Sequence, residues 1–121
     1  MQDTQKNFYK KLLGKRGEVA AVKYLKKQGY KIINRNYRGH HGEADIIALD
    51  KEVLVFVEVK TRTNVNFGLP CEAVGYEKQS TYIELAKEYI YIFKLEDKDV
   101  RFDIIEILNN EINHIKDAFQ G

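Results

Sequence analysis

The feature that most constrains the fold is a run of five apolar residues that ends in charged residues. Residues 53–57 read Val-Leu-Val-Phe-Val, and Glu58-Val59-Lys60 follow directly. A short unbroken apolar run is typical of a β-strand that is covered on both of its faces. We therefore expect an α/β protein, in which helices pack on the sheet that contains this strand.

The whole chain predicts two helices and five strands, of which the apolar run belongs to the third strand. The helices are expected at residues 4–28 and 76–93, and the strands at residues 30–38, 44–49, 53–60, 100–108 and 111–119. Gly29 suits the end of the first helix, because glycine adopts the left-handed conformation there without penalty. The expected buried faces of the two helices contain Ala21, Val22 and Leu25, and Tyr82, Ile83, Ala86, Tyr89, Ile90 and Phe93.

Length and composition favour one globular domain over residues 1–121. The single cysteine, Cys71, cannot form an internal disulfide, and we interpret it as a small apolar filler. The N-terminus lacks the apolar segment of a signal peptide, and no apolar run is long enough to span a bilayer. We expect a cytoplasmic protein with no membrane segment.

Charge is distributed unevenly along the chain. Residues 1–42 contain eleven Lys and Arg against two Asp and Glu, a net charge of +9, whereas residues 43–121 carry a net −7. This asymmetry favours a surface that contacts a polyanion beside one that binds a cation, although a solvated lysine-rich helix explains it as well. The candidate phosphate contacts are Lys10, Lys11, Lys15, Arg16, Arg38, Arg62 and Lys78, together with His40 and His41.

Two acidic residues point to a metal site. Asp45 begins one apolar strand and Glu58 ends the next, and a tight turn at residues 50–52 makes these strands antiparallel neighbours. Two adjacent carboxylates repel one another unless a cation lies between them, and Mg²⁺ or Mn²⁺ prefers oxygen ligands. Lys60 shares a strand face with Glu58. Glu18 offers a third carboxylate. Each of these residues alone fits an ordinary surface or locally paired charge.

The ordered motifs of this chain resemble those of the bacterial YraN-like family, which is uncharacterised in function. The matching motifs are residues 14–18, 36–38, 42–48, 55–62, 67–74, 78–79 and 101–103. That family is assigned to the restriction-endonuclease-like PD-(D/E)XK superfamily and is similar to archaeal Holliday-junction resolvases. The resemblance implies a restriction-endonuclease-like core, with a central mixed sheet of about five strands flanked by helices.

The resemblance also implies roles for individual residues. Asp45, Glu58 and the carbonyl of Val59 would bind Mg²⁺ (or Mn²⁺), and Lys60 would be the motif lysine. Glu18 would be the acid of the first helix, and Gln79 and Lys78 would reach the site from the second helix. Ala44 replaces the proline after which the superfamily motif is named.

Three functions are compatible with these features. The first is a metal-dependent endonuclease that acts on DNA, including branched or junction DNA. The second is a nucleic-acid-binding module of the same fold with little or no catalysis. The third is an interaction protein that self-associates through its charge asymmetry. A resolvase-like activity would call for a homodimer, because two symmetric strands must be cut.

Overall fold

The computed structural model describes residues 3–62 and 74–121, with side chains described for Phe8 and from Lys11 onward. Cys71 and most of the motif at residues 67–74 lie outside the described residues, as does the side chain of Lys10. Within the described parts, no helix is long and apolar enough to cross a membrane.

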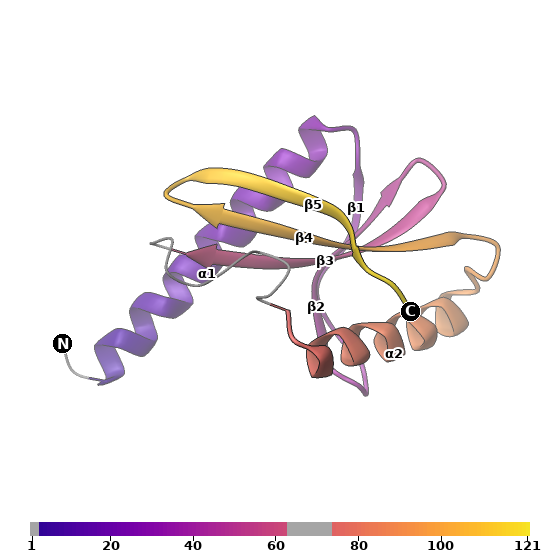
Figure 1. The fold of residues 1–121 in the computed structure, drawn as a ribbon, viewed down its shortest axis with the longest axis horizontal. Helices are drawn as coiled ribbons and strands as arrows, with labels where there is room; N and C mark the ends of the chain where they lie inside the picture. The colour runs from indigo at the N-terminus through magenta and orange to yellow at the C-terminus, as the bar shows by residue number, and fades with distance from the viewer. Residues whose placement is uncertain (1–2, 63–73) are drawn as a thin grey trace.

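Seven elements follow one another along the chain (Figure 1). They are α1 (Asp3–Lys27), β1 (Lys31–Arg38), β2 (Glu43–Asp50), β3 (Val53–Arg62), α2 (Tyr76–Phe93), β4 (Asp99–Leu108) and β5 (Glu111–Phe119). All seven were predicted from the sequence, to within two residues at each boundary. The largest difference is at β3, which continues past Lys60 to Arg62.

The five strands form one mixed sheet in the order β1-β2-β3-β4-β5. Each neighbouring pair is antiparallel except β3 and β4, which run parallel. Parallel neighbours need a crossover connection, and α2 lies within it. The predicted α/β fold with a mixed five-stranded sheet is therefore confirmed, and it is consistent with a restriction-endonuclease-like core.

The side chains of β3 alternate between two hydrophobic cores. Val55 and Val57 pack with Ala21 and Leu25 of α1, whereas Leu54 and Phe56 pack with α2. This arrangement explains the unbroken apolar run, because both faces of β3 are covered and Val55, Phe56 and Val57 have no solvent exposure.

The predicted buried face of α2 was wrong in two places. Leu85 is buried, although it was not expected there, while Phe93 keeps 49% of its surface exposed. Phe93 lies in the last turn of the helix and packs its ring on Tyr89 at 4.5 Å between centroids. Its contacts are therefore with other aromatic rings at the rim of the core, where part of its own ring faces solvent.

Gly17 allows α1 to lie close against β3. A Cβ atom at this position would overlap Oγ1 of Thr61, so any other residue would require the Thr61 side chain or the helix to shift. Glycine weakens a helix interior but permits close approach of another element. The neighbouring residue, Glu18, is thereby placed near the ends of the central strands.

Candidate metal-binding active site

Asp45 and Glu58 meet where the ladder between β2 and β3 ends. The last paired residues are Ile46 and Val57, so the same register would set Asp45 opposite Glu58 one step further. At this position the backbone pairing is replaced by a side-chain contact. Oδ2 of Asp45 accepts a hydrogen bond from the Val59 backbone N–H at 2.8 Å. The turn at residues 50–52 fixes this register, as the sequence analysis expected.

The buried position of Asp45 and the charge of Glu58 beside it act on the Asp45 carboxyl. Burial, followed by the negative charge of Glu58, raises the pKa of Asp45 to about 7. The Val59 N–H opposes this rise, whereas a hydrogen bond with Glu58 and the charge of Glu18 add to it. Asp45 and Glu58 therefore resist being ionised together, which is the electrostatic situation that a bound cation relieves.

Glu58 is buried and has two lysines beside it. Only 4% of its surface is exposed. Lys60 Nζ lies 3.9 Å from its Oε1, and Lys78 Nζ lies 3.3 Å from its Oε2. Oε2 nevertheless accepts no hydrogen bond within the described residues, so Lys78 is close enough for an ion pair but is not aligned to donate. A buried carboxylate oxygen without a donor retains a strong tendency to bind a cation.

Tyr82 supports the carboxylate pair from α2. Its hydroxyl donates to the Val57 carbonyl at 3.4 Å and accepts from the Asp45 backbone N–H at 3.3 Å. Burial, with the charges of Glu58 and Asp45, raises the pKa of Tyr82 well above its ordinary value, so the hydroxyl stays neutral. Sequence reasoning assigned Tyr82 only to the core, because nothing in an apolar helical stripe distinguishes a tyrosine that also uses its hydroxyl.

The remaining predicted site residues occupy different places. Gln79 directs its amide to the Val74 carbonyl at 2.9 Å, so Lys78 is the α2 residue that pairs with Glu58. Val59 uses its N–H on Asp45. Glu18 is partly buried and lines a cavity between α1 and β1, from which its charge acts on Asp45.

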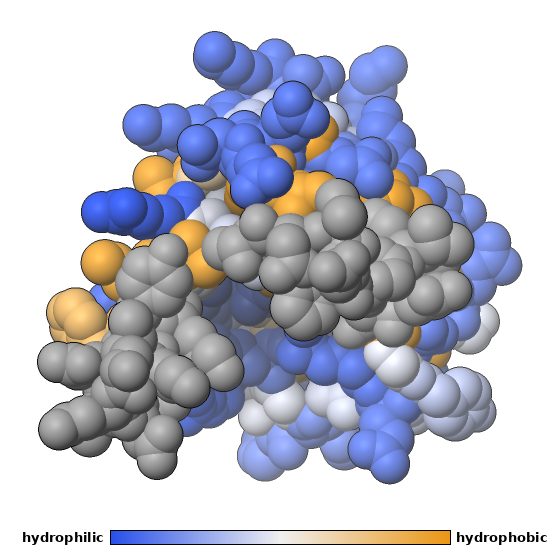
Figure 2. Space-filling view, turned by 60° about the vertical axis from the view of Figure 1, so that its left-hand side comes forward, coloured by the Kyte–Doolittle hydropathy of each residue, from blue (hydrophilic) through white to orange (hydrophobic). Residues whose placement is uncertain are grey.

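Several of the predicted phosphate contacts are already paired with acidic residues. Arg38 pairs with Glu43 at 3.4 Å, Arg62 pairs with Glu106 at 3.1 Å, and His40 contacts Glu88 at 3.0 Å. Of the predicted contacts on α1, Lys11, Lys15 and Arg16 are exposed. Figure 2 shows one face of the molecule, whose described surface is mostly hydrophilic with several hydrophobic patches.

The donor set fits a hard divalent cation that is completed by other ligands. No group of three His, Cys, Asp or Glu side chains converges closely enough to hold a metal within the described residues. Two adjacent carboxylates are present, however, and one has a buried oxygen without a hydrogen-bond donor. Mg²⁺ commonly binds through one or two carboxylates, waters and substrate phosphate oxygens.

Comparison with known proteins places the chain in a family. A UPF0102 protein of Caldanaerobacter subterraneus subsp. tengcongensis is 47% identical over 121 residues, which cover 94% of this chain and 99% of that protein. A UPF0102 protein of Clostridioides difficile is 47% identical and covers 85% of this chain and 92% of its own length. The model of the uncharacterised protein family UPF0102 matches residues 17–107, which contain Glu18, Asp45, Glu58 and Lys60. The chain belongs to this family.

Proposed function

We propose that this protein is a Mg²⁺-dependent (or Mn²⁺-dependent) endonuclease that hydrolyses phosphodiester bonds in DNA. The observation that carries the proposal is the adjacent pair Asp45 and Glu58, with a raised pKa on Asp45 and a lysine beside Glu58. Perturbed carboxylates that share one end of a sheet with a cationic side chain are typical of catalytic sites. Branched or junction DNA is one candidate substrate, and a homodimer would suit it.

The chemistry follows from the charges that phosphodiester hydrolysis must accommodate. Asp45 and Glu58 would hold the divalent ion, which supplies Lewis acidity and lowers the pKa of bound water. A water oxygen attacks phosphorus and gives up a proton to solvent, the bond to the leaving oxygen breaks and that oxygen takes up a proton, and negative charge grows on the phosphate during the step. The Lys60 ammonium, 3.9 Å from Glu58 Oε1, would offset this charge.

The neighbouring groups would position Asp45 and balance the charge of Glu58. Tyr82 and the Val59 N–H fix the backbone and the carboxylate of Asp45. Lys78 neutralises Glu58 from the opposite side to Lys60, since the two ammoniums lie near different carboxylate oxygens. Lys78, which is partly exposed, would turn to the phosphate once the ion is bound.

One observation favours a second candidate, a binding module with little catalysis. Lys60 and Lys78 already surround Glu58 with positive charge. Such a cluster balances the buried carboxylate without a metal, and it could contact a phosphate group of nucleic acid in the same arrangement. The two candidates differ in whether divalent ions and Lys60 lead to cleavage of the bound DNA.

A cleavage panel tests the proposal. Single-stranded, duplex, flap and four-way-junction DNA would be incubated with Mg²⁺ or Mn²⁺ and with the unmodified protein, Lys60→Ala and Lys116→Ala. Lys116 is exposed on β5 and serves as the matched loss of one lysine. We expect Lys60→Ala to lose roughly 10²–10³-fold or more in cleavage rate, as for other single groups that stabilise transition-state charge, with little change in DNA affinity.

The outcomes separate the two candidates. Cleavage that Lys60→Ala abolishes and Lys116→Ala preserves supports the endonuclease. DNA binding without any cleavage, with an affinity that does not depend on divalent ions, would replace it with the binding module.

A further inference from the structure

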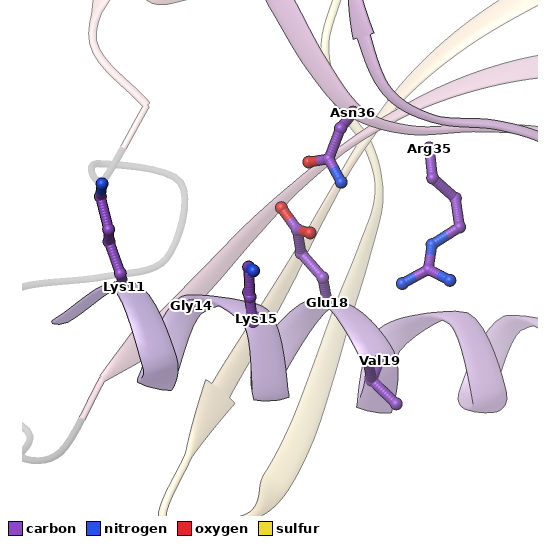
Figure 3. Close-up of a pocket in the computed structure, with 7 residues that line it drawn as sticks. All are labelled: Lys11, Gly14, Lys15, Glu18, Val19, Arg35 and Asn36. Carbon is purple, nitrogen blue, oxygen red and sulfur yellow. The ribbon is translucent and has the colours of Figure 1, made fainter. Parts of the chain in front are cut away.

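A cavity opens between α1 and β1, beside the carboxylate pair. Its volume is about 540 Å³, and it is lined by α1 residues between Lys11 and Val19 and by Arg35 and Asn36 of β1 (Figure 3). That volume exceeds the space of a lone anion and lies within the range of roughly 300–1,000 Å³ found for small-molecule sites. The cavity therefore has room for a ligand the size of a nucleotide.

Three positive side chains approach this cavity from two elements. Lys11 and Lys15 come from α1, and Arg35 extends from β1 toward the helix (Figure 3). All three are exposed, and none makes an ion pair within the described parts of the chain. Arg38 on the same strand is instead paired with an acid. These three unpaired cations outweigh the one carboxylate of the lining, Glu18, so the cavity suits a ligand that carries a phosphate group.

Gly14 lies in the wall of the cavity, in the interior of α1. A Cβ atom at this position would meet no atom within 4 Å, unlike a Cβ atom at Gly17, which would overlap Thr61. Glycine inside a helix costs about 1 kcal/mol relative to alanine, and no packing within the described chain requires it here. The absent side chain keeps the cavity open for a group that approaches the helix backbone closely.

Asn36 connects the cavity to Asp45. It lies across from Asp45 in the register of β1 and β2, between the pairs Arg35–Ile46 and Tyr37–Ala44. Its φ of 50° is left-handed, which asparagine tolerates better than most residues. Its side chain points toward Glu18, whose charge in turn acts on Asp45 (Figure 3).

We propose that this cavity binds one nucleotide unit of a nucleic-acid strand, next to the nucleotide whose phosphate faces Asp45 and Glu58. Lys11, Lys15 and Arg35 hold its phosphate, Gly14 gives it room against α1, and Asn36 contacts its sugar or base. The assignment rests on the proposed function for the neighbouring phosphate. It goes beyond that function because it also assigns the path of the nucleic-acid strand, which would run between α1 and β1.

The decisive variant is Gly14→Leu, which fills the cavity from a position with open space around it. A structural role for Gly14 predicts unchanged binding, whereas a ligand-facing role predicts weaker binding by a protein that is equally or more stable to heat. We expect at least a roughly tenfold loss of affinity for a labelled single-stranded oligonucleotide, measured by fluorescence anisotropy in a metal chelator. The affinity of Gly14→Ala should lie between those of the unmodified protein and Gly14→Leu.

The charge variants provide an independent measurement. Arg35→Gln and Lys15→Gln should each reduce the slope of log affinity against log salt by about 0.7, the value for one phosphate contact of a single strand. The matched control is Lys26→Gln, in the last turn of α1, which should change the slope much less. Asn36→Gly keeps the left-handed backbone and removes only the amide, and it should weaken binding severalfold.

The results can reject this site without reference to cleavage. Gly14→Leu with unchanged affinity, or Arg35→Gln with no more effect than Lys26→Gln, would overturn it. Displacement of the oligonucleotide by inorganic phosphate, beyond that by chloride at equal ionic strength, would indicate an isolated anion site instead of a strand. If the binding results hold and no variant or metal gives cleavage, the cavity assignment stands and the endonuclease fails.

Discussion

Two aspartates in the same sheet have opposite electrostatic environments. Asp103 on β4 is fully buried, and it accepts hydrogen bonds from two nitrogens of Arg101, from His114 and from the Asp117 backbone N–H, at 2.7–3.0 Å. Burial alone would raise the pKa of Asp103, but the hydrogen bonds from His114, Arg101 and Asp117 outweigh it and lower the pKa. Asp45 has the opposite shift, because burial and Glu58 outweigh its one backbone donor.

The partners of Asp103 are themselves satisfied. Arg101 also donates to Asp50 at 3.0 Å and to the Tyr30 hydroxyl at 2.7 Å, and the second ring nitrogen of His114 lies 3.0 Å from the Tyr24 hydroxyl. This network ties α1 and the strand ends together, and it leaves Asp103 no capacity that a ligand would fill. We infer that Asp103 serves stability and Asp45 serves binding, a division that the following variants test.

The largest expected effect is on the stability of the fold, from Asp103→Ala. Removing this carboxylate leaves Arg101 and His114 largely buried without their main partner. Breaking a buried ion pair costs about 3–5 kcal/mol, a large part of the roughly 5–15 kcal/mol that stabilises a typical domain. Urea unfolding near neutral pH measures it, with the exposed Asp99→Ala on the same strand as control. A loss below about 1 kcal/mol would contradict the structural role of Asp103.

Asp45→Asn should act in the opposite direction. The folded pKa of Asp45, about 7, lies above its ordinary value of 3.8. The unfolded chain therefore loses this proton first, and stability falls as pH rises from about 4 to about 7, with the full penalty above that range. The neutral amide of the Asp45→Asn variant would carry no such penalty. This variant should be more stable in metal-free buffer near pH 8, by about 1–3 kcal/mol after allowance for solvent screening. Equal stability of both proteins across this pH range would show that ionised Asp45 does not destabilise the folded protein.

The surroundings of Asp45 were easier to predict from the sequence than those of Asp103, for a physical reason. Asp45 and Glu58 are brought together by a tight turn and a two-residue side-chain period, both of which are local and visible in the sequence. Asp103 meets His114 across a hairpin with an irregular register, and His114 meets Tyr24, 90 positions away. No spacing rule specifies such partners, so the sequence marked Arg101 and Asp103 only as part of a family motif.

Other parts of the site were hidden for similar reasons. The irregularity in register between Ile32 and Asn34 determines which β1 residue faces Asp45. No feature of the sequence predicts this irregularity. Asn36 and Arg35 were consequently not predicted as site residues. The helices and strands were predictable because their apolar periods and glycine stops are local. The approach of Lys78 to Glu58 depends on how α2 packs on the sheet, so it was expected only from the family resemblance.

The affinity for a divalent ion should depend on pH in the range set by Asp45. A metal and a proton compete for the carboxylate, so below about pH 7 the affinity should fall by up to tenfold per pH unit, or about 1.4 kcal/mol. Titration calorimetry with Mn²⁺ at pH values of about 6, 7 and 8 measures this dependence, and buffers of different ionisation enthalpy report the released proton. Glu58→Gln is the control that should bind little metal. Affinity that is independent of pH would place the ion elsewhere.

The smallest expected effect comes from Lys78, which shares Glu58 with Lys60. Its ammonium occupies space that a cation on Glu58 would need, and it is partly exposed, so the pair is worth less than about 1 kcal/mol. Lys78→Gln should therefore bind Mn²⁺ about two- to fivefold more tightly in the absence of DNA. Lys87→Gln is the matched control, since Lys87 lies on the same helix and pairs with Glu84 instead. Weaker Mn²⁺ binding by Lys78→Gln would mean that Lys78 helps to hold Glu58 in place, and that the carboxylate site resembles the satisfied Asp103 cluster more closely than its raised pKa indicates.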